Sequence, residues 1–310
     1  MMNRLIESVE SLLIVFGLRI LWILPEPFVR ELACLVGWVL SETLRSRRRI
    51  IEQNLRIAFG PDLSHARMAH IRQQSWINIV MTTVEVLRYP CHEEKYLREV
   101  QFEGIEHIID SLSKGRGAIL VTPHMGNWEL GGAGMARRVP FGVIARPLNQ
   151  KPLARLMDNL RAQMGMTVFA KKSALKGVLA FLRRGGVVAF MLDQHASRQS
   201  VAVPFFGQPA KTVTSAAMLA LRTGAAVHFA HTRRIPDGNI RLRIQPAFEI
   251  ESTGDLEHDI FQATAQYTLA IEAAIREHPE CWLWMHRRWR KPKPGDIQKK
   301  SPGIGAKKGV

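Results

Sequence analysis

The segment GAILVTPHMGNWE (117–129) decides the fold class of this chain. Its first half is a short apolar run, which is typical of a strand buried on both faces of a sheet. Similar apolar runs follow, and helix-like stretches lie between them. The runs are 140–146, 166–170, 187–193 and 225–231, and the clearest helical patterns are 71–88, 173–186, 212–224 and 255–277. Strands that alternate with helices predict an α/β fold with a mixed, largely parallel central sheet flanked by helices.

Polar residues follow three of these predicted strands. His124 comes directly after the first strand, Arg146 ends the second, and Asp193 and Gln194 end the run 187–193. The carboxyl ends of parallel strands meet at one edge of a sheet, where α/β proteins place their chemistry. We therefore predict a site at this edge, with Arg146 suited to a phosphate or carboxylate of the substrate.

The spacing of His124 and Glu129 suggests a general base and its carboxylate partner. With 11 histidines and 27 acidic residues in the chain, about one such spacing arises by chance, so the context matters. A separation of five residues on one helix puts two side chains ~140° apart, whereas a strand–turn–helix junction lets them meet. Asn127 is placed to cap a helix that begins at Trp128. We expect Glu129 to orient His124 for attack on a hydroxyl proton; the alternative is a structural histidine.

Charge is concentrated in three parts of the chain. There are 43 Lys and Arg residues against 27 Asp and Glu residues in 310, a net charge of +16. Segments 45–72, 137–184 and 287–310 carry +5, +10 and +8, so the remainder is net negative. Such local excess predicts an anionic partner: a membrane surface, a phosphorylated ligand, an acidic protein or nucleic acid. A hydrophobic content of 46% excludes a wholly disordered chain.

The cysteines and histidines give no metal-site pattern. Cys34, Cys91 and Cys281 lie too far apart for a disulfide framework or a CxxC zinc site. His228 and His231 are three residues apart on a predicted strand, so they face opposite sides of it. We therefore predict no metal.

The first 44 residues favour membrane attachment. Runs 11–24 (SLLIVFGLRILWIL) and 32–40 (LACLVGWVL) are apolar, and the basic cluster RSRRR (45–49) follows them. Neither run reaches the ~18–20 uninterrupted apolar residues of a spanning helix. An apolar segment beside a basic cluster favours an anchor that spans the bilayer or lies in its interface, with two buried or paired helices as the alternative. We predict an anchor at 1–44, a catalytic domain at 45–290 and a disordered basic tail at 291–310.

Three further segments have two interpretations each. The loop-like run 201–212 is either core or a wall for an acyl chain, and the cluster Gly131–Gly134 is either close packing or room for an alkyl chain. Trp282, Trp284 and Trp289 lie beside basic residues, as in a nucleic-acid surface. They fit better as an interfacial belt.

These residues carry a family resemblance that spans nearly the whole chain. The matching segments, in addition to the apolar N-terminus, are RRRIIEQNLRIAF (47–59), SWINIVMTTVE (75–85), VTPHMGNWE (121–129), ARPLN (145–149), MLDQ (191–194), VPFFGQPAKT (203–212) and HPECWLWMHRRWRKPKP (278–294). The chain resembles the late acyltransferases of lipid A biosynthesis, within the lysophospholipid acyltransferase superfamily. One departure is DQHASR at 193–198, where well-known members carry an Asp-His-Asp-type segment; it bears on acceptor identity and acyl length.

The resemblance implies a membrane-associated O-acyltransferase at the cytoplasmic face of the bacterial inner membrane. It implies acyl carrier protein as donor, a phosphorylated lipid A precursor as acceptor, and neither metal nor cofactor. On this chain His124 and Glu129 would be catalytic, and Arg146, Asp193, Asn127 and Gln194 would bind substrate. The alternatives are a lysophospholipid or glycolipid acyltransferase that uses acyl-CoA or acyl carrier protein, and a basic protein that docks on membranes or binds nucleic acid.

Overall fold

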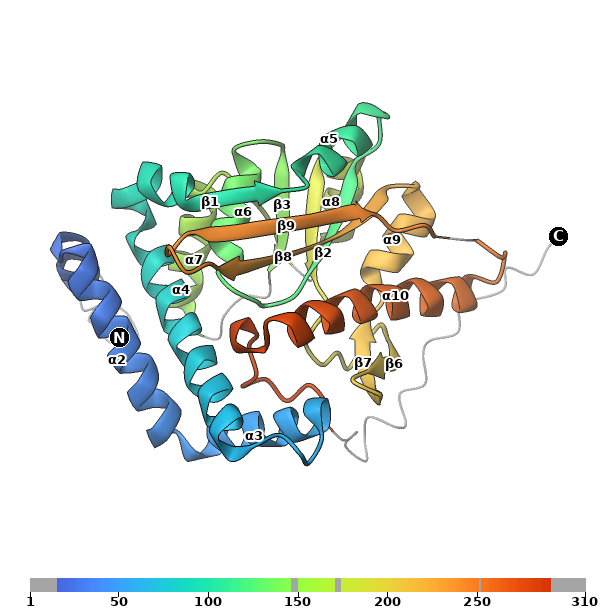
Figure 1. Ribbon diagram of the computed structural model, residues 1–310. Helices are drawn as coiled ribbons and strands as arrows, with labels where there is room; N and C mark the ends of the chain where they lie inside the picture. The colour runs from blue at the N-terminus through green and yellow to red at the C-terminus, as the bar shows by residue number, and fades with distance from the viewer. Residues whose placement is uncertain (1–15, 146–149, 171–173, 251, 291–310) are drawn as a thin grey trace, which may run out of the picture.

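A seven-stranded sheet forms the centre of the molecule (Figure 1). The computed structural model describes residues 16–145, 150–170, 174–250 and 252–290. The strands, in their order across the sheet, are β1 Val100–Glu103, β9 Ile240–Ala247, β8 Ala226–Arg234, β2 Ala118–Thr122, β5 Val187–Met191, β3 Phe141–Ala145 and β4 Thr167–Ala170. Every neighbouring pair is parallel except β8 and β9. The predicted mixed, largely parallel α/β sheet is therefore confirmed.

Helices cover both faces of this sheet. Their bounds are α2 Glu26–Thr43, α3 Arg45–Phe59, α4 His65–Glu99, α5 Ile105–Ser113, α6 Trp128–Ala136, α7 Lys151–Gln163, α8 Ala174–Arg183, α9 Ser215–Thr223 and α10 Leu256–Glu277, with a 3₁₀ turn at Pro279–Cys281. Alternate residues of β2 point to opposite sides. Ile119 and Val121 join a core with α3, α8, α9 and α10, whereas Ala118 and Leu120 join a second core with α5, α6 and α7.

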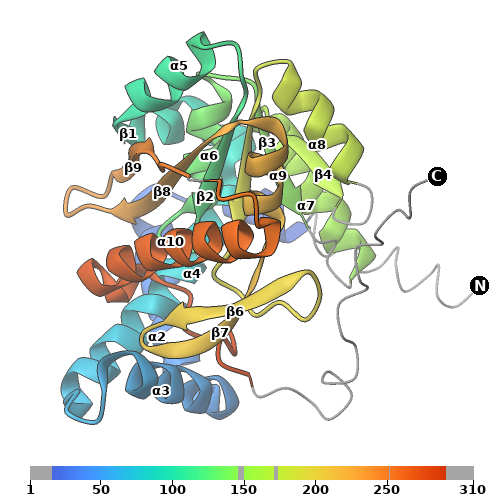
Figure 2. The ribbon, with the colours of Figure 1, turned by 90° about the vertical axis from the view of Figure 1, so that its right-hand side faces the viewer.

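The segment predicted as an apolar loop is a β-hairpin. Strands β6 Ser200–Phe205 and β7 Gln208–Val213 pair antiparallel and lie between α10 and α3 (Figure 2). Phe205 and Phe206 at its tip are buried in the core. Of the two interpretations of this run, the core one is correct for these residues.

Close packing explains the glycine cluster of α6. A Cβ atom on Gly131 would lie 2.6 Å from the Thr232 side chain, and one on Gly132 would lie 2.9 Å from Met166 Sδ. These glycines let α6 approach β8 and the residues before β4, so they leave no room for an alkyl chain.

The interfacial-belt interpretation of the tryptophans is wrong for two of them. Trp282 and Trp284 are 1% and 0% exposed, because the segment that follows α10 runs beneath α3 and α4. Ser75 on α4 donates a hydrogen bond to the carbonyl of Trp282, and Asn54 on α3 donates one to that of Trp284.

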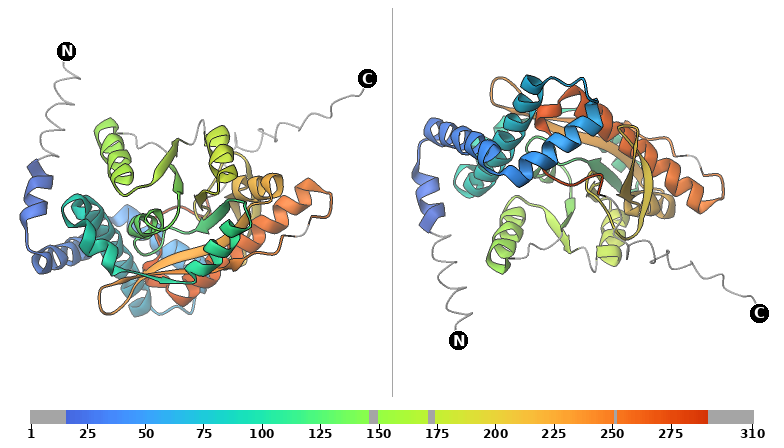
Figure 3. Two further views of the ribbon diagram at one scale, coloured as in Figure 1. Left: turned by 90° about the horizontal axis from the view of Figure 1, so that it is seen from above. Right: turned by 90° about the horizontal axis from the view of Figure 1, so that it is seen from below.

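Helix α2 pairs with α4 along a stripe of small residues and leaves its other side uncovered. Val29, Ala33, Gly37 and Ser41 are buried at intervals of four residues, and a Cβ on Gly37 would lie 2.6 Å from the Ile77 backbone. Figure 3 shows α2 at one edge of the molecule. Apolar side chains exposed on α2 and on the helical segment 16–23 before it are Phe16, Ile20, Ile23, Phe28, Leu32, Leu35, Val36, Trp38 and Val39.

The structure bears on part of the predicted membrane anchor at 1–44 and does not test the predicted tail at 291–310. Within the described residues, no helix has the combined length and apolar character needed to cross a bilayer. Residues 1–15 and the predicted tail 291–310 lie outside the part of the chain that the structure describes.

Candidate active site

The two residues at the centre of the site come from adjacent strands. β2 and β5 pair in parallel with Thr122 opposite Met191, and His124 and Asp193 each follow two residues after the strand end. The register therefore delivers both side chains to the same edge of the sheet, as the sequence predicts.

Asp193 holds His124 by two hydrogen bonds. Its Oδ1 lies 2.7 Å from His124 Nδ1, and its Oδ2 accepts the His124 backbone N–H at 2.7 Å. Trp282 Nε1 also donates to Oδ2 at 2.8 Å. The Asp193 side chain is only 2% exposed. Burial alone would raise the pKa of this carboxyl, but the charge of His124 and these hydrogen bonds outweigh it and hold the pKa at about 2.

The other ring nitrogen of His124 faces outward. With Nδ1–H directed at the carboxylate, Nε2 keeps its lone pair, and the Gln194 amide nitrogen lies 3.4 Å from it. The His124 side chain is 18% exposed, and the edge of the Trp128 ring packs against it at 5.1 Å between ring centroids. A substrate hydroxyl that replaces the Gln194 amide would meet this lone pair.

The turn that carries His124 is fixed on both sides. Gly126 has a φ of +58°, and a Cβ there would lie 2.3 Å from the Thr232 carbonyl oxygen, so the turn requires glycine. Thr232 donates to the Met125 carbonyl at 2.6 Å, and the Leu283 N–H donates to the His124 carbonyl at 3.1 Å. These bonds hold the imidazole in place before substrate arrives.

The structure puts Asp193, and not Glu129, on the imidazole of His124. Both carboxylate oxygens of Glu129 bind Arg161 on α7, at 2.6 and 3.1 Å. The side chains of this pair are 9% and 20% exposed. Glu129 lies in the first turn of α6, from which it joins α6 to α7. The prediction from sequence missed this pair because Arg161 lies 32 residues from Glu129, within the basic segment 137–184.

Asn127 caps α6, as predicted, but belongs to the scaffold. Its Oδ1 accepts the Leu130 N–H at 3.0 Å, and its Nδ2 donates to Glu85 on α4 at 2.7 Å. Arg234 donates to the same Glu85 oxygen at 2.7 Å. Asn127 is 1% exposed, and both polar atoms of its side chain have protein partners.

The remaining predicted residues have different positions. Gln194 lies next to His124, and Asp193 is hydrogen-bonded to the histidine. Arg146 follows β3, which neighbours β5, but it lies outside the described residues. The prediction from sequence did not place Trp282 next to Asp193. It assigned the run that contains this tryptophan to a membrane-interface belt.

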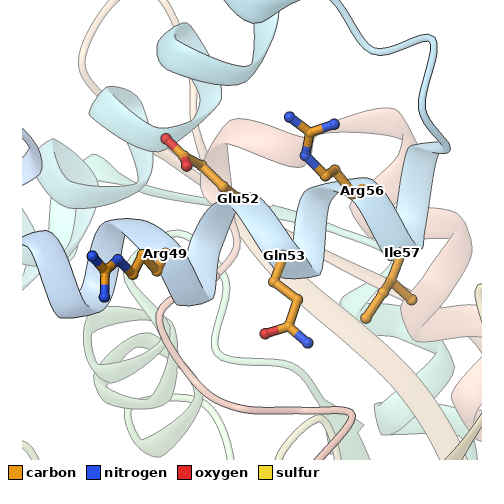
Figure 4. Close-up of a pocket in the computed structure, with 5 residues that line it drawn as sticks. All are labelled: Arg49, Glu52, Gln53, Arg56 and Ile57. Carbon is orange, nitrogen blue, oxygen red and sulfur yellow. The ribbon is translucent and has the colours of Figure 1, made fainter.

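Helix α3, which lies in the basic segment 45–72, bears a hollow on its surface. A cavity of about 430 Å³ is lined by Arg49, Glu52, Gln53, Arg56 and Ile57 (Figure 4). Not all of the basic charge in this segment faces outward, because Arg72 is buried and pairs with Glu42 at 2.6 Å. In the part of the chain that the structure describes, no group of three or more His, Cys, Asp or Glu residues is arranged to hold a metal ion.

A histidine held by a buried carboxylate at the carboxyl ends of parallel strands is an arrangement that activates hydroxyl groups. The family model described as "Bacterial lipid A biosynthesis acyltransferase" matches residues 3–291, and the chain belongs to this family. It is an acyltransferase.

Relatives of known activity cover most of the chain. The lipid A biosynthesis lauroyltransferase of Escherichia coli (strain K12) is 28% identical over 88% of this chain and 90% of its own length. The palmitoleoyltransferase of the same organism is 27% identical over 89% and 90%. A phosphatidylinositol mannoside acyltransferase of Mycolicibacterium smegmatis is 28% identical over 66% and 67%.

Among solved structures, the crystal structure of the 1-acyl-sn-glycerophosphate acyltransferase from Thermotoga maritima aligns with a TM-score of 0.36. It is 15% identical and covers 79% of this chain and 98% of that chain.

Proposed function

We propose that this protein moves a fatty acyl chain from acyl carrier protein to a hydroxyl of a phosphorylated lipid A precursor, at the cytoplasmic face of the inner membrane. The observation that carries the proposal is the 2.7 Å contact of His124 Nδ1 with buried Asp193, which leaves Nε2 available as a base. Membership of the lipid A acyltransferase family supports the choice of substrates.

The first step is proton transfer from the acceptor. The acceptor hydroxyl displaces the Gln194 amide and donates its proton to His124 Nε2. The imidazolium that forms is stabilised by the Asp193 carboxylate, whose pKa of about 2 keeps it ionised at neutral pH. Asp193 therefore supplies charge and orientation, and does not take the proton itself.

The second step forms the ester. The acceptor oxygen attacks the thioester carbonyl, and the carbon–sulfur bond breaks after a tetrahedral intermediate has formed. The departing thiolate takes the proton from His124 Nε2, which restores the neutral imidazole. We place the oxyanion near the amino end of α6, which begins at Trp128.

Charge and apolar surface support the partners. Arg146, which follows β3, is proposed to bind a phosphate of the acceptor, and the basic residues of 137–184 and of the α3 hollow are proposed to attract an acidic carrier protein. The exposed apolar side of α2 is proposed to lie in the membrane interface, beside the basic residues that begin α3.

A second candidate acceptor is a glycolipid or lysophospholipid. The observation that favours it is the similarity to phosphatidylinositol mannoside acyltransferases over two thirds of the chain. The segment DQHASR (193–198), which departs from the pattern of the family it resembles, bears on acceptor identity without selecting one.

A matrix of donors and acceptors tests the proposal. The purified full-length protein is offered acyl carrier protein or CoA thioesters, with a lipid A precursor, its dephosphorylated form, a lysophospholipid or a phosphatidylinositol mannoside. We expect mass spectrometry to detect the acylated lipid A precursor, formed faster from the acyl carrier protein thioester than from the CoA thioester. Arg146→Lys should act poorly on the phosphorylated acceptor, because a point charge cannot bind phosphate bidentately. Faster acylation of another lipid would overturn the acceptor assignment, and equal use of CoA the donor assignment.

A further inference from the structure

Trp282 reaches the candidate site from the far end of the chain. It follows the 3₁₀ turn after α10 and is fully buried. Its backbone is held from two sides, because Ser75 donates to its carbonyl at 2.6 Å and Met125 forms an isolated antiparallel bridge with it. The indole therefore has a fixed position, and its N–H points at Asp193 Oδ2 from 2.8 Å.

The indole N–H is the one recorded donor to Asp193, within the described residues, that does not come from His124 itself. The two other donors are the ring and the backbone N–H of His124. The backbone bond ties Oδ2 to the turn that follows β2. The Trp282 bond ties the same oxygen to a separate segment that packs under α3 and α4, so the carboxylate is held from two directions.

The same C-terminal segment also holds the two residues that follow Asp193. The Arg288 guanidinium donates to the Gln194 carbonyl at 3.2 Å and to the Lys211 carbonyl at 2.7 Å. His286 Nε2 accepts the His195 N–H at 3.0 Å. Burial lowers the pKa of His286 to about 4, so this nitrogen is free of a proton and can accept. The turn after β5 is thus fastened residue by residue from one segment.

We propose that Trp282 is a positioning residue of the acyl-transfer site: its indole N–H fixes the Asp193 carboxylate in the plane and direction that orient His124. The inference rests on the proposed role of His124 and Asp193. It assigns catalytic importance to a side chain that touches neither substrate nor base.

Trp284 is a matched control in the same segment. It is also fully buried, and its ring centroid lies 4.6 Å from that of Trp282. Its indole N–H donates to the Pro279 carbonyl at 2.6 Å, so it is not a donor to Asp193. Replacing either tryptophan by phenylalanine removes one buried indole N–H and a similar volume, but only Trp282→Phe removes a donor to Asp193.

The experiment compares kcat, KM and thermal stability of Trp282→Phe and Trp284→Phe. Loss of a hydrogen bond to a charged group should lower kcat of Trp282→Phe about 10-fold with little change in KM. Trp284→Phe should lose at least as much thermal stability and keep a kcat near that of the wild type. Equal kcat losses in the two variants, or a wild-type kcat in Trp282→Phe, would overturn the proposal.

Two additions keep the test decisive. If Trp282→Phe does not fold, benzothienylalanine at position 282 replaces the N–H by sulfur with nearly the same shape, and the same kcat loss is expected. Nitrogen NMR of the histidine rings gives a readout that needs no substrate, with the His124 signals identified by their absence from His124→Ala. Trp282→Phe should shift these signals and Trp284→Phe should not; unchanged signals would contradict the positioning role. If the wild type does not acylate the offered lipids but the His124 signals shift in Trp282→Phe, only the proposed substrates are refuted.

Discussion

Two buried carboxylates near His124 have different partners. Glu129 lies five residues away in sequence and binds Arg161, whereas Asp193 lies 69 residues away and binds the imidazole. The pairing of β2 with β5 explains the second contact, because it brings two strand ends together. The comparison teaches that the role of a buried carboxylate depends on its partner. An imidazole can gain and lose a proton during turnover, whereas a guanidinium stays charged.

Removing His124 from the His124–Asp193 pair should have the largest effect. We expect His124→Ala to lower kcat/KM by ~10²–10⁴, because a general base contributes on that scale. Acylated product is measured by mass spectrometry, and circular dichroism checks that the fold is kept. A variant that folds and transfers acyl groups at the wild-type rate would remove His124 from the mechanism.

Asp193→Asn should come next, with kcat lower by about 10²-fold, because the imidazolium loses its counter-charge. The variant also tests a pH effect. The folded-state pKa of about 2 lies below the ordinary value of 3.8, so ionised Asp193 stabilises the fold above pH 4. That contribution, about 2 kcal/mol, is lost as the pH falls toward 2.

Urea unfolding between pH 5 and pH 2 measures this dependence. The difference in the free energy of unfolding between wild type and Asp193→Asn should shrink as the pH falls. A constant difference over that range would show that the carboxylate is not held in its charged form by His124.

Breaking the Glu129–Arg161 pair should reduce activity through the scaffold. We expect Glu129→Gln and Arg161→Met each to lower the free energy of unfolding by about 2 kcal/mol and kcat by about 10-fold, because each leaves a mostly buried group without its partner. The double variant should be no worse than either single one. If Glu129→Gln loses activity with Arg161→Met unaffected, Glu129 has a direct catalytic role that this pairing does not explain.

Changes on the outside of α2 should have the smallest effect on chemistry. Leu35→Ser with Trp38→Ser removes exposed apolar surface, so binding to anionic lipid vesicles should fall several-fold while kcat in detergent stays unchanged. Leu256→Ser with Leu269→Ser is the control, since these residues are 43% and 65% exposed on α10. Equal loss of vesicle binding in both variants would contradict a membrane role for α2.

Local patterns predict much of this molecule, and long-range contacts account for what they miss. The runs that became β2 and β5 are continuous and apolar, so their strand ends, with His124 and Asp193, could be placed from the sequence. The choice of Glu129 as the partner of His124 failed because it used the nearest acid, and no local pattern shows that Arg161 binds that acid.

The aromatic and basic run after α10 shows the same limit. Trp282 and Arg288 look like surface residues beside other basic side chains, but both are fully buried. Trp282 is covered by α4, and Arg288 is covered by the turn after β5 and by the β6–β7 hairpin, all of them distant in sequence. Hydrophobic periodicity describes local structure only, so it does not predict contacts between segments so far apart in sequence.

Helix α4 contacts both the turn that carries His124 and the helical segment 16–23 before α2. Near its middle, Thr82 and Asn78 donate to the Gly126 carbonyl, and further along Arg88 donates to the carbonyls of Leu21 and Leu24. The tight α2–α4 seam leaves the outer apolar face little freedom to swing. If that face lies in a bilayer, as proposed, the connection through α4 would set the distance from the bilayer surface to the His124 imidazole. Which hydroxyl of a lipid is acylated would then be selected by its depth as well as by its chemistry.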